Sequence, residues 1–176
     1  MRFTLVDRIL ELEPGVRITT VKALSLAEEY LADHFPCFPV MPGVLMLEAM
    51  TQSGAWLIRA SEDFAHSMVL LKEARNVRYG GFVSPGQVLT VTAEIVKADA
   101  RVTELKTQGL LNGRIAVSGR LVLERYNLAE DRPDRAAADA IVRHSMRGLF
   151  GLLYTGGSSE SGYGSAEELT PSESAR

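Results

Sequence analysis

The chemistry of this sequence centres on His34 and Glu48, which belong to one continuous stretch of loop and helix-forming residues. An imidazole titrates near physiological pH, so its neutral form can act as a general base. A carboxyl group in apolar surroundings is costly to ionise, so it tends to keep its proton and can act as a general acid. The alternative for each residue is a structural role, which is the commoner one for histidines and carboxylates.

The position of His34 is fixed by the prolines that follow it. Pro36, Pro39 and Pro42 restrict φ, and each favours extended geometry in the residue before it, so the loop is rigid. Pro42 also suits the first turn of a helix. Residues 44–60 are rich in Leu, Met and Ala and contain no proline, which predicts a helix. Its apolar residues lie nearly all round, which indicates a buried, central helix.

Two further residues complete a site around this pair. Gly43 lies at the predicted helix N-terminus, where an unpaired N–H points along the positive end of the helix dipole. Gln52 is one turn after Glu48 and shares its face, so its amide can hydrogen-bond the carboxyl group. The alternative for Gln52 is an ordinary amide on the helix surface. Together the four residues predict a base, an oxyanion site and an acid.

The stretch from His34 to Gln52 reads His-Phe-Pro-x-x-Pro-x-x-Pro-Gly-Val-Leu-x-x-Glu-Ala-x-x-Gln. It closely resembles the signature of the hotdog-fold 3-hydroxyacyl-acyl-carrier-protein dehydratases of type II fatty-acid synthesis, and is most similar to their FabZ branch. The resemblance extends more weakly from about Phe3 to about Leu123. It implies a hotdog fold and the removal of water from a (3R)-3-hydroxyacyl thioester.

The resemblance also implies a role for each site residue. His34 takes the proton from C2, and the N–H of Gly43 binds the thioester oxygen. Glu48, supplied by the partner subunit, protonates the departing hydroxyl group, and Gln52 orients Glu48 or a water. Phe38 and Val44 are assigned to the substrate-binding walls.

Two positions depart from the pattern or separate its branches. The family most often has glycine where Cys37 stands, and the interpretation favoured here for Cys37 is a small apolar residue filling the loop, with a reactive thiol as the alternative. The FabA branch, which also isomerises the double bond, usually has cysteine where Val44 stands and aspartate where Glu48 stands. The sequence therefore favours the FabZ branch.

The implied partner is an acidic acyl carrier protein, which calls for a basic docking surface. Lys72, Arg75 and Arg78 lie on the strand that borders the entrance in the family. Strand alternation places Arg75 and Arg78 on opposite faces unless a bulge intervenes, and an ordinary solvated face is the alternative. Family members pair into dimers, so a homodimer or a hexamer built as a trimer of dimers is expected.

Composition excludes several other classes of protein. The chain has 176 residues, one cysteine and a net charge of −3, which argues against nucleic-acid binding and excludes an internal disulfide. A reducing cytoplasm is the expected compartment. No secretory signal or membrane-spanning run is evident. No metal-ligand spacing or phosphate loop occurs either, so chemistry without a metal or cofactor is expected.

The remaining chain predicts an α+β fold. A hairpin is predicted over 3–12 and 16–21, and a short helix begins at Ser25 because a glutamate three residues later suits a capping box. Alternation predicts strands at 68–79, 88–97, 101–111 and 114–125, with Asn112-Gly113 as a tight hairpin turn. An antiparallel sheet wrapped around the long helix follows.

The C-terminal part is expected to differ from the domain at 1–127. Residues 128–154 form a helical extension, with a stripe on one face of a helix over 135–154: Ala138, Ile141, Val142, Ser145, Leu149, Leu152 and Leu153. This helix docks on protein, or alternatively on a membrane surface or partner. Residues 155–176 are rich in Gly, Ser and Glu and are expected to be disordered.

Other functions stay open at this stage. A hotdog thioesterase would release free thiol, and a non-catalytic or secondary-pathway protein would bind acyl thioesters without turning them over. The carrier, either acyl carrier protein or coenzyme A, is likewise open.

Overall fold

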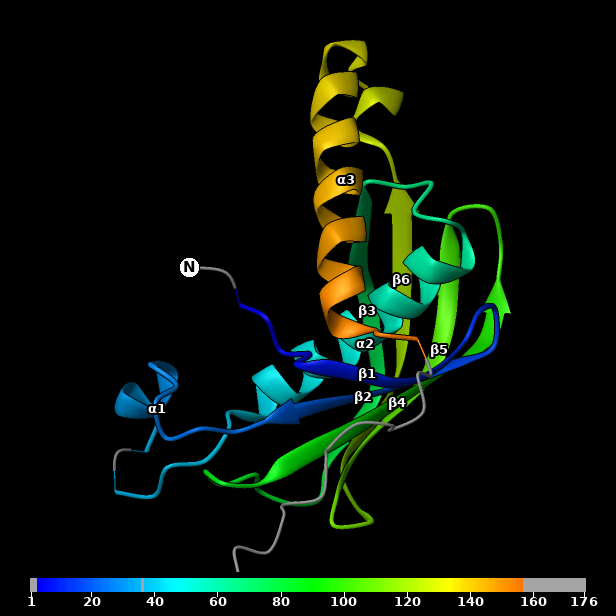
Figure 1. Ribbon diagram of the computed structural model, residues 1–176. Coiled ribbons are helices and arrows are strands. Elements are labelled where there is room, and N and C mark those ends of the chain that lie inside the picture. The colour runs from blue at the N-terminus through cyan, green and yellow to red at the C-terminus, as the bar shows by residue number, and fades with distance from the viewer. Residues whose placement is uncertain (1–2, 36, 157–176) are drawn as a thin grey trace, which may run out of the picture.

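The computed structural model describes residues 3–35 and 37–156, in which one antiparallel sheet curves around a long helix (Figure 1). The sheet has the strand order β1-β2-β4-β5-β6-β3. Its strands are β1 (Arg8–Glu13), β2 (Arg17–Ala23), β3 (Met68–Tyr79), β4 (Val88–Ala98), β5 (Val102–Leu111) and β6 (Arg114–Tyr126). The predicted α+β class and the sheet wrapped around a helix are confirmed.

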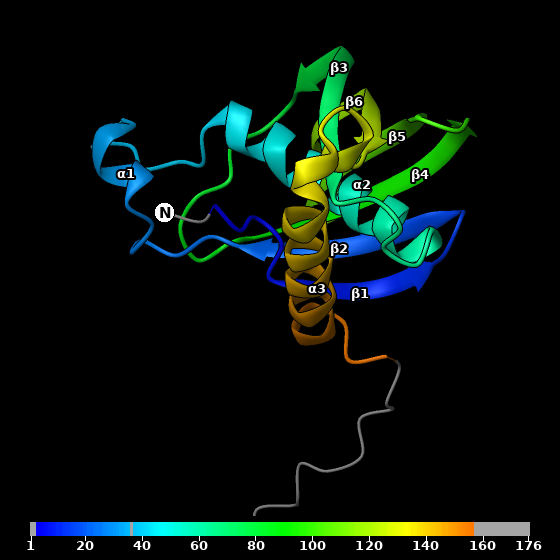
Figure 2. The same ribbon diagram turned by 90° about the horizontal axis from the view of Figure 1, so that it is seen from above.

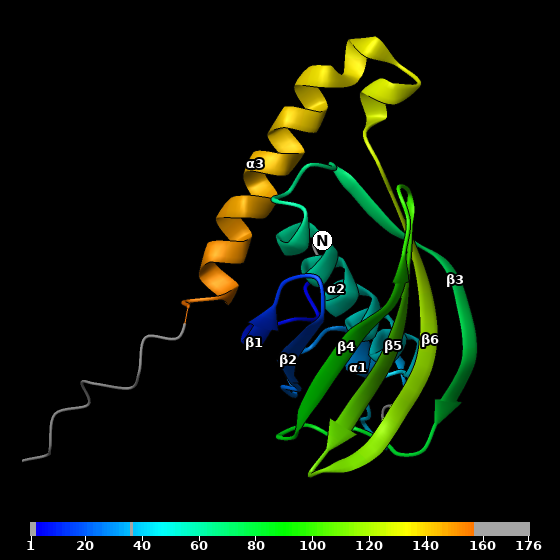
Figure 3. The ribbon, with the colours of Figure 1, turned by 90° about the vertical axis from the view of Figure 1, so that its right-hand side faces the viewer.

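Two helices precede β3 and the others follow β6. They are α1 (Tyr30–Asp33), α2 (Gly43–Ser61), the short 3₁₀ helices η1 (Leu128–Glu130) and η2 (Pro133–Arg135), and α3 (Ala136–Leu153). Figure 2 shows α1 beyond the N-terminal end of α2 and away from α3. Figure 3 shows α2 between the sheet and α3. None of the helices in the described ranges is long and apolar enough to cross a membrane.

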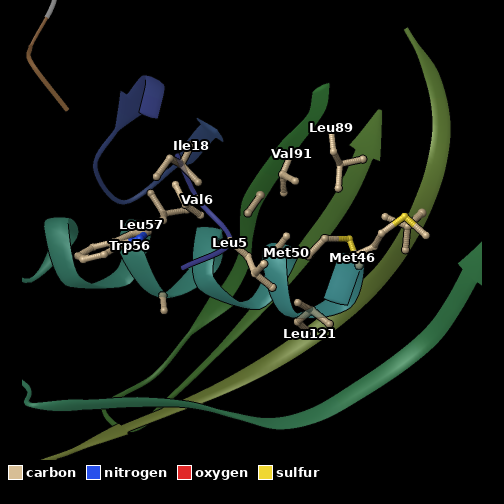
Figure 4. Packing of buried hydrophobic residues seen from close by; sticks show 14 of the residues in the cluster. Leu5, Val6, Ile18, Met46, Met50, Trp56, Leu57, Leu89, Val91 and Leu121 are labelled. Atoms are coloured by element: carbon tan, nitrogen blue, oxygen red, sulfur yellow. The ribbon is translucent and has the colours of Figure 1, made fainter. Parts of the chain in front are cut away.

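The core forms where α2 meets the concave face of the sheet (Figure 4). Met46, Met50 and Leu57 of α2 are almost completely buried against residues such as Leu121. Gly54 brings the helix close to the sheet, because a Cβ there would lie 2.5 Å from Cδ1 of Leu105. Burial of this kind contributes about 1.5–3 kcal/mol per large side chain, so α2 is a rigid platform for the groups on its other faces.

The N-terminal region differs from the sequence prediction in two places. The first strand begins at Arg8 and not at Phe3, because the backbone groups of Phe3 and Leu5 bond to the side chain of Gln52. The helix predicted from Ser25 is wrong. The Ser25 hydroxyl accepts the N–H of Ala27 and closes a turn, and helix begins only at Tyr30.

The predicted hairpin at Asn112-Gly113 is confirmed. Asn112 and Gly113 have φ of 49° and 77°, and they connect β5 to β6. Positive φ at both central residues matches the twist of the flanking strands. This turn sets the register of β5 and β6, the strands that carry much of the core under α2.

β3 is an edge strand with an unusually long exposed surface. It pairs only with β6 among the described strands, and Leu70 and Leu71 on it are exposed. A long unpaired edge with apolar side chains is a surface that proteins normally cover or pair. This edge therefore has room for a further strand.

The helix predicted over 135–154 is confirmed as α3. The apolar stripe predicted for its packed face is partly wrong. Ile141 and Leu152 are 67% and 79% exposed. The side chains that pack on the core are Met146, Leu149, Phe150 and Leu153. Asp139, at the start of the helix, is buried and sets the rotation of α3 through its hydrogen bonds. Disorder was predicted for residues 155–176, of which 157–176 lie outside the described residues.

Candidate active site

The N-terminus of α2 presents unpaired backbone N–H groups. The carbonyl of Pro42 accepts the N–H groups of Leu45 and Met46, at 2.9 and 3.2 Å. In the described part of the chain, the N–H groups of Gly43 and Val44 have no hydrogen-bond partner. Such groups at the positive end of a helix dipole favour an anion or an oxygen that develops negative charge.

Gly43 also permits a close approach of β3 to this helix end. A Cβ at Gly43 would lie 3.1 Å from Cε1 of Tyr79, the last residue of β3. The neighbouring Val44 is 68% exposed. The end of α2 is therefore open to solvent on one side and bordered by an aromatic ring on the other.

Gln52 holds Glu48 in place, as the sequence predicted. Nε2 of Gln52 donates to Oε1 of Glu48 at 3.0 Å and to the carbonyl of Phe3 at 3.0 Å. Oε1 of Gln52 accepts the N–H of Leu5 at 2.8 Å. Because a backbone N–H can only donate, it fixes which end of the amide is the oxygen. Both amide hydrogens are then directed at acceptors, one of them the half-buried carboxyl group of Glu48.

Glu48 and Gln52 line a cavity of about 450 Å³. Trp56 and Arg59 continue its wall along α2, and Met146 and Leu149 of α3 contribute from the other side. Leu70 and Leu71 on the exposed edge strand β3 border it as well. A largely apolar cavity with a few placed polar groups is the usual form of a small-molecule or acyl-chain site.

Arg59 is the charged group in the far part of this cavity. Burial lowers the pKa of its guanidinium from the ordinary value to about 10, so it is still protonated at neutral pH. The guanidinium lies 5.9 Å from the ring centre of Trp56, and Nη2 is 3.5 Å from the carbonyl of Ser67. Its buried Nε has no hydrogen-bond partner among the described residues.

His34 lies at the C-terminal end of α1, apart from this cavity. It is half-buried, its N–H donates to the carbonyl of Tyr30 at 3.2 Å, and its ring centre is 4.4 Å from that of Phe35. The described residues that line the cavity of Glu48 do not include His34. One chain therefore does not bring the predicted base and acid together, and their meeting across two subunits stays a prediction.

The loop after His34 exposes apolar surface. Phe38 is 57% exposed and packs edge-on against Phe82 at 5.8 Å between ring centres. Cys37 is exposed with a free thiol, so the interpretation of Cys37 as a small residue filling the loop is wrong. Val40 and Met41, at the end of this loop, are buried, whereas Phe35 and Phe38 before them stay exposed in the described chain.

The three predicted docking residues, Lys72, Arg75 and Arg78, are all exposed on β3. Arg75 lies opposite Arg120 of β6, and Arg78 lies opposite Ser118, with a register irregularity between them. Positions 118 and 120 share one face, so this bulge places Arg75 and Arg78 on the same face of the sheet. Lys72 pairs with Glu124 at 3.5 Å and Arg75 pairs with Glu73.

The sequence reasoning missed the far wall of the cavity. Trp56, Arg59 and Met146 were not singled out, and Leu149 was placed only on a generic apolar stripe. Helical spacing does put Trp56 and Arg59 on the face of Glu48 and Gln52. No local signal shows that α3 crosses this face. Within the described ranges, no three His, Cys, Asp or Glu side chains lie close enough to hold a metal ion together.

Known proteins match most of this sequence. The sequence model of the FabA-like domain family matches residues 1–125. The chain is 35% identical over 119 residues to the 3-hydroxyacyl-[acyl-carrier-protein] dehydratase FabZ of Ruminiclostridium cellulolyticum, covering 68% of this chain and 84% of that protein. It is 38% identical over 120 residues to the FabZ of Geobacillus thermodenitrificans, covering 68% and 83%.

Solved structures support the fold. The dehydratase heterocomplex ApeI:P from Xenorhabdus doucetiae superposes with a TM-score of 0.59 and 20% identity, over 72% of this chain and 86% of that one. At this identity the match concerns the fold alone. The family match and the identity to the FabZ proteins carry the assignment. The chain belongs to the FabA-like family and is similar in sequence to its FabZ dehydratases.

Proposed function

We propose that this enzyme removes water from a (3R)-3-hydroxyacyl group carried on acyl carrier protein and gives the trans-2-enoyl thioester, in type II fatty-acid synthesis. The observation that carries the proposal is the fixed carboxyl group of Glu48, held by Gln52 in the wall of a largely apolar cavity. The names and identity of the FabZ relatives support the same reaction.

The proposed chemistry uses three groups. The neutral imidazole of His34 takes a proton from C2, and the N–H of Gly43 stabilises the charge that develops on the thioester oxygen. The electron pair then forms the C2–C3 double bond as the C3–O bond breaks, and Glu48 gives its proton to the departing hydroxyl group. Water leaves, and the imidazolium returns its proton to the carboxylate through solvent.

A second copy of the chain brings His34 to the cavity of Glu48 in this proposal. The unpaired edge of β3, with its exposed Leu70 and Leu71, supports a homodimer in which two β3 edges pair about a twofold axis. His34 of one subunit then faces Glu48 of the other. The complete assembly is either this homodimer or a hexamer built from three such dimers.

The surroundings of the site suit a carrier-bound substrate. Phe38 and Val44, both exposed near the start of α2, form the entrance walls that the thioester end passes. The exposed cations Lys72, Arg75 and Arg78 on β3 supply the docking surface for an acidic carrier protein. The reaction needs no metal or cofactor, and its compartment is the cytoplasm.

The test is hydration of crotonyl thioester and dehydration of 3-hydroxyacyl carrier protein by the purified protein. His34→Ala and Glu48→Gln are each expected to lower kcat by about 10²–10⁴ while the protein stays folded, because each removes one proton transfer. His144→Ala and Glu94→Gln, at exposed positions away from the site, are the matched controls. Full activity in either site variant removes that residue from the mechanism.

Mixing the two inactive variants tests whether the site is shared between subunits. A mixed dimer of His34→Ala and Glu48→Gln chains has one intact site and one that lacks both groups. Random exchange is therefore expected to restore about a quarter of wild-type activity in a twofold dimer. If activity is not restored after subunit exchange has been demonstrated, the shared site is contradicted.

The same assays separate the alternative functions. Release of free thiol in place of the enoyl product identifies a thioesterase, and binding without turnover identifies a non-catalytic acyl-thioester protein.

A further inference from the structure

We infer that α3 closes the far end of the acyl cavity, and that Met146 and Leu149 on it determine the length of acyl chain that the enzyme accepts. This inference rests on the proposed function, since it takes the cavity of Glu48 as the acyl site. It concerns a segment that lies after the family match, which ends at residue 125.

The cavity has a reacting end and a far end. Glu48 and Gln52 lie toward the N-terminal half of α2, and Arg59 lies on the same wall near its C-terminus. The helical rise separates Glu48 from Arg59 by about 16 Å. A chain whose hydroxyl group lies at Glu48 therefore runs along α2 toward Trp56 and Arg59, and Met146 and Leu149 of α3 line the same cavity. Figure 3 shows α3 beside the C-terminal part of α2.

α3 is fixed at its N-terminal end by buried polar contacts. Asp139 is 2% exposed, and Oδ1 accepts from Oγ of Ser67 and from the N–H of Leu128, the latter at 2.9 Å. Its Oδ2 accepts the N–H of Ala129 at 2.9 Å. Buried and satisfied hydrogen bonds of this kind specify one position for the element that carries them.

α3 is fixed at its other end by aromatic packing. Phe150 lies 6.1 Å from Trp56 and 5.4 Å from Phe64 between ring centres, and Leu153 is buried. Arg147 pairs with Asp63 at 2.9 Å. Because α3 is held at both ends, it keeps its position when the cavity is occupied. Its side chains therefore limit the length of the bound acyl chain.

Met146 and Leu149 face the cavity between these two anchors. Both are apolar and only partly buried, and both line the same space as Glu48. The same cavity wall carries the charged guanidinium of Arg59, which is an unfavourable neighbour for the methyl end of an alkyl chain. The end of the accepted chain therefore lies at Met146 and Leu149.

The experiment measures kcat/KM of the full-length enzyme with 3-hydroxyacyl carrier proteins of increasing chain length. Met146→Ala and Leu149→Ala are expected to shift the optimum by about two carbons toward longer chains, with a gain of about tenfold for the longer substrate, because each newly buried methylene adds binding energy. Leu149→Trp is expected to shift it toward shorter chains. Ile141→Ala and Leu152→Ala, on the exposed face of the same helix, leave the profile unchanged.

A second measurement does not depend on turnover. Trp56 is the single tryptophan of the sequence and lines the cavity, so its fluorescence reports occupancy by S-acyl pantetheines of increasing length. The Met146→Ala and Leu149→Ala variants are expected to bind longer chains more tightly than the wild type does. Folded variants whose activity and binding profiles match the wild type overturn the inference. Inactivity of every protein with every chain, combined with the expected binding shifts, overturns the proposed reaction and leaves the role of α3 supported.

Discussion

The two ends of α2 differ in their exposure to solvent. At the N-terminal end, Gly43 and Val44 keep unpaired N–H groups in the described chain, and Phe38 and Val44 are more than half exposed. At the C-terminal end, Trp56 is 6% exposed and Leu57 is completely buried. The same helix thus has one end open to solvent and one end covered by α3.

This difference separates the two tasks of the site. The open end carries the groups proposed to handle the thioester, and it shows the exposed apolar side chains that mark an interaction surface. The covered end carries the wall proposed to hold the alkyl chain. That wall is formed by α2 and α3 of a single subunit. In this proposal the proton transfers depend on a partner subunit, whereas the limit on acyl-chain length is set within one subunit.

The largest expected effect concerns the open end. Gly43→Pro deletes the N–H proposed to bind the thioester oxygen, and proline is well tolerated at the first position of a helix. The preceding residue, Pro42, has φ −53 and ψ 137. This is already the extended conformation that a following proline requires. We expect kcat to fall by about 10²–10³ with little change in Tm.

Gly43→Ala is the control for this prediction. It adds the same Cβ beside the ring of Tyr79 but keeps the N–H. If alanine and proline lower kcat equally, the crowding of Tyr79 is responsible and the oxyanion role of Gly43 is wrong.

The next effect compares one substitution at both ends. Phe150→Ala at the covered end removes ring contacts with Trp56 and Phe64. It is expected to lower the free energy of unfolding by about 2 kcal/mol. Phe38→Ala at the open end replaces a ring that is mostly exposed, and it should change that free energy by no more than about 0.5 kcal/mol. Denaturant unfolding measures both. Equal losses would show that the loop of Phe38 is as firmly packed as α3.

The sequence predicted the elements that local pattern determines. Pro42 and Gly43 marked the start of α2, and alternation and Asn112-Gly113 marked β4, β5 and β6. The hydrogen bond between Gln52 and Glu48 followed from helical spacing alone. Each of these features depends on residues near one another in the chain.

The features that depend on distant residues were missed. Hydrophobicity placed Ile141 and Leu152 on the packed face of α3, but the buried bonds of Asp139 to Ser67 and to η1 rotate the helix. The start of β1 was placed too early because Gln52, far along the chain, takes the backbone groups of Leu5 and Phe3. The bulge between Arg75 and Arg78, which the sequence left open as an alternative, also comes from pairing with the distant strand β6.

A smaller effect concerns Asp139, which fixes α3 over the covered end, and the dependence of protein stability on pH. Burial raises the pKa of Asp139, but the hydrogen bonds from Ser67, Ala129 and Leu128 and the charge of Arg143 outweigh it and hold the pKa below its usual value. A carboxyl group with a lowered folded-state pKa stabilises the protein above its unfolded pKa, about 4, and loses that contribution as the pH falls through the folded value.

Asp139→Asn is therefore expected to lower Tm at neutral pH and to have little effect in acid, where the wild type has lost the same contribution. Thermal unfolding across the acid range measures this. Asp134→Asn, at an exposed position on η2, is the control and should keep the wild-type pH profile. A constant difference between Asp139→Asn and wild type at every pH would show that Asp139 acts by packing and not by charge.

The smallest effect concerns carrier docking at the open end. Arg78 lies next to Tyr79, whose ring borders Gly43, and it has no ion-pair partner in the described ranges, whereas Lys72 is paired with Glu124 farther along β3. Arg78→Ala is expected to raise KM for an acyl carrier protein substrate by about threefold at low salt, in line with the modest strength of exposed charge pairs. Lys72→Ala should have less effect, because Lys72 already has a carboxylate partner. Neither variant should change KM for an acyl pantetheine, which lacks the acidic carrier. A rise in KM with the pantetheine substrate would place Arg78 in the substrate channel and not on the docking surface.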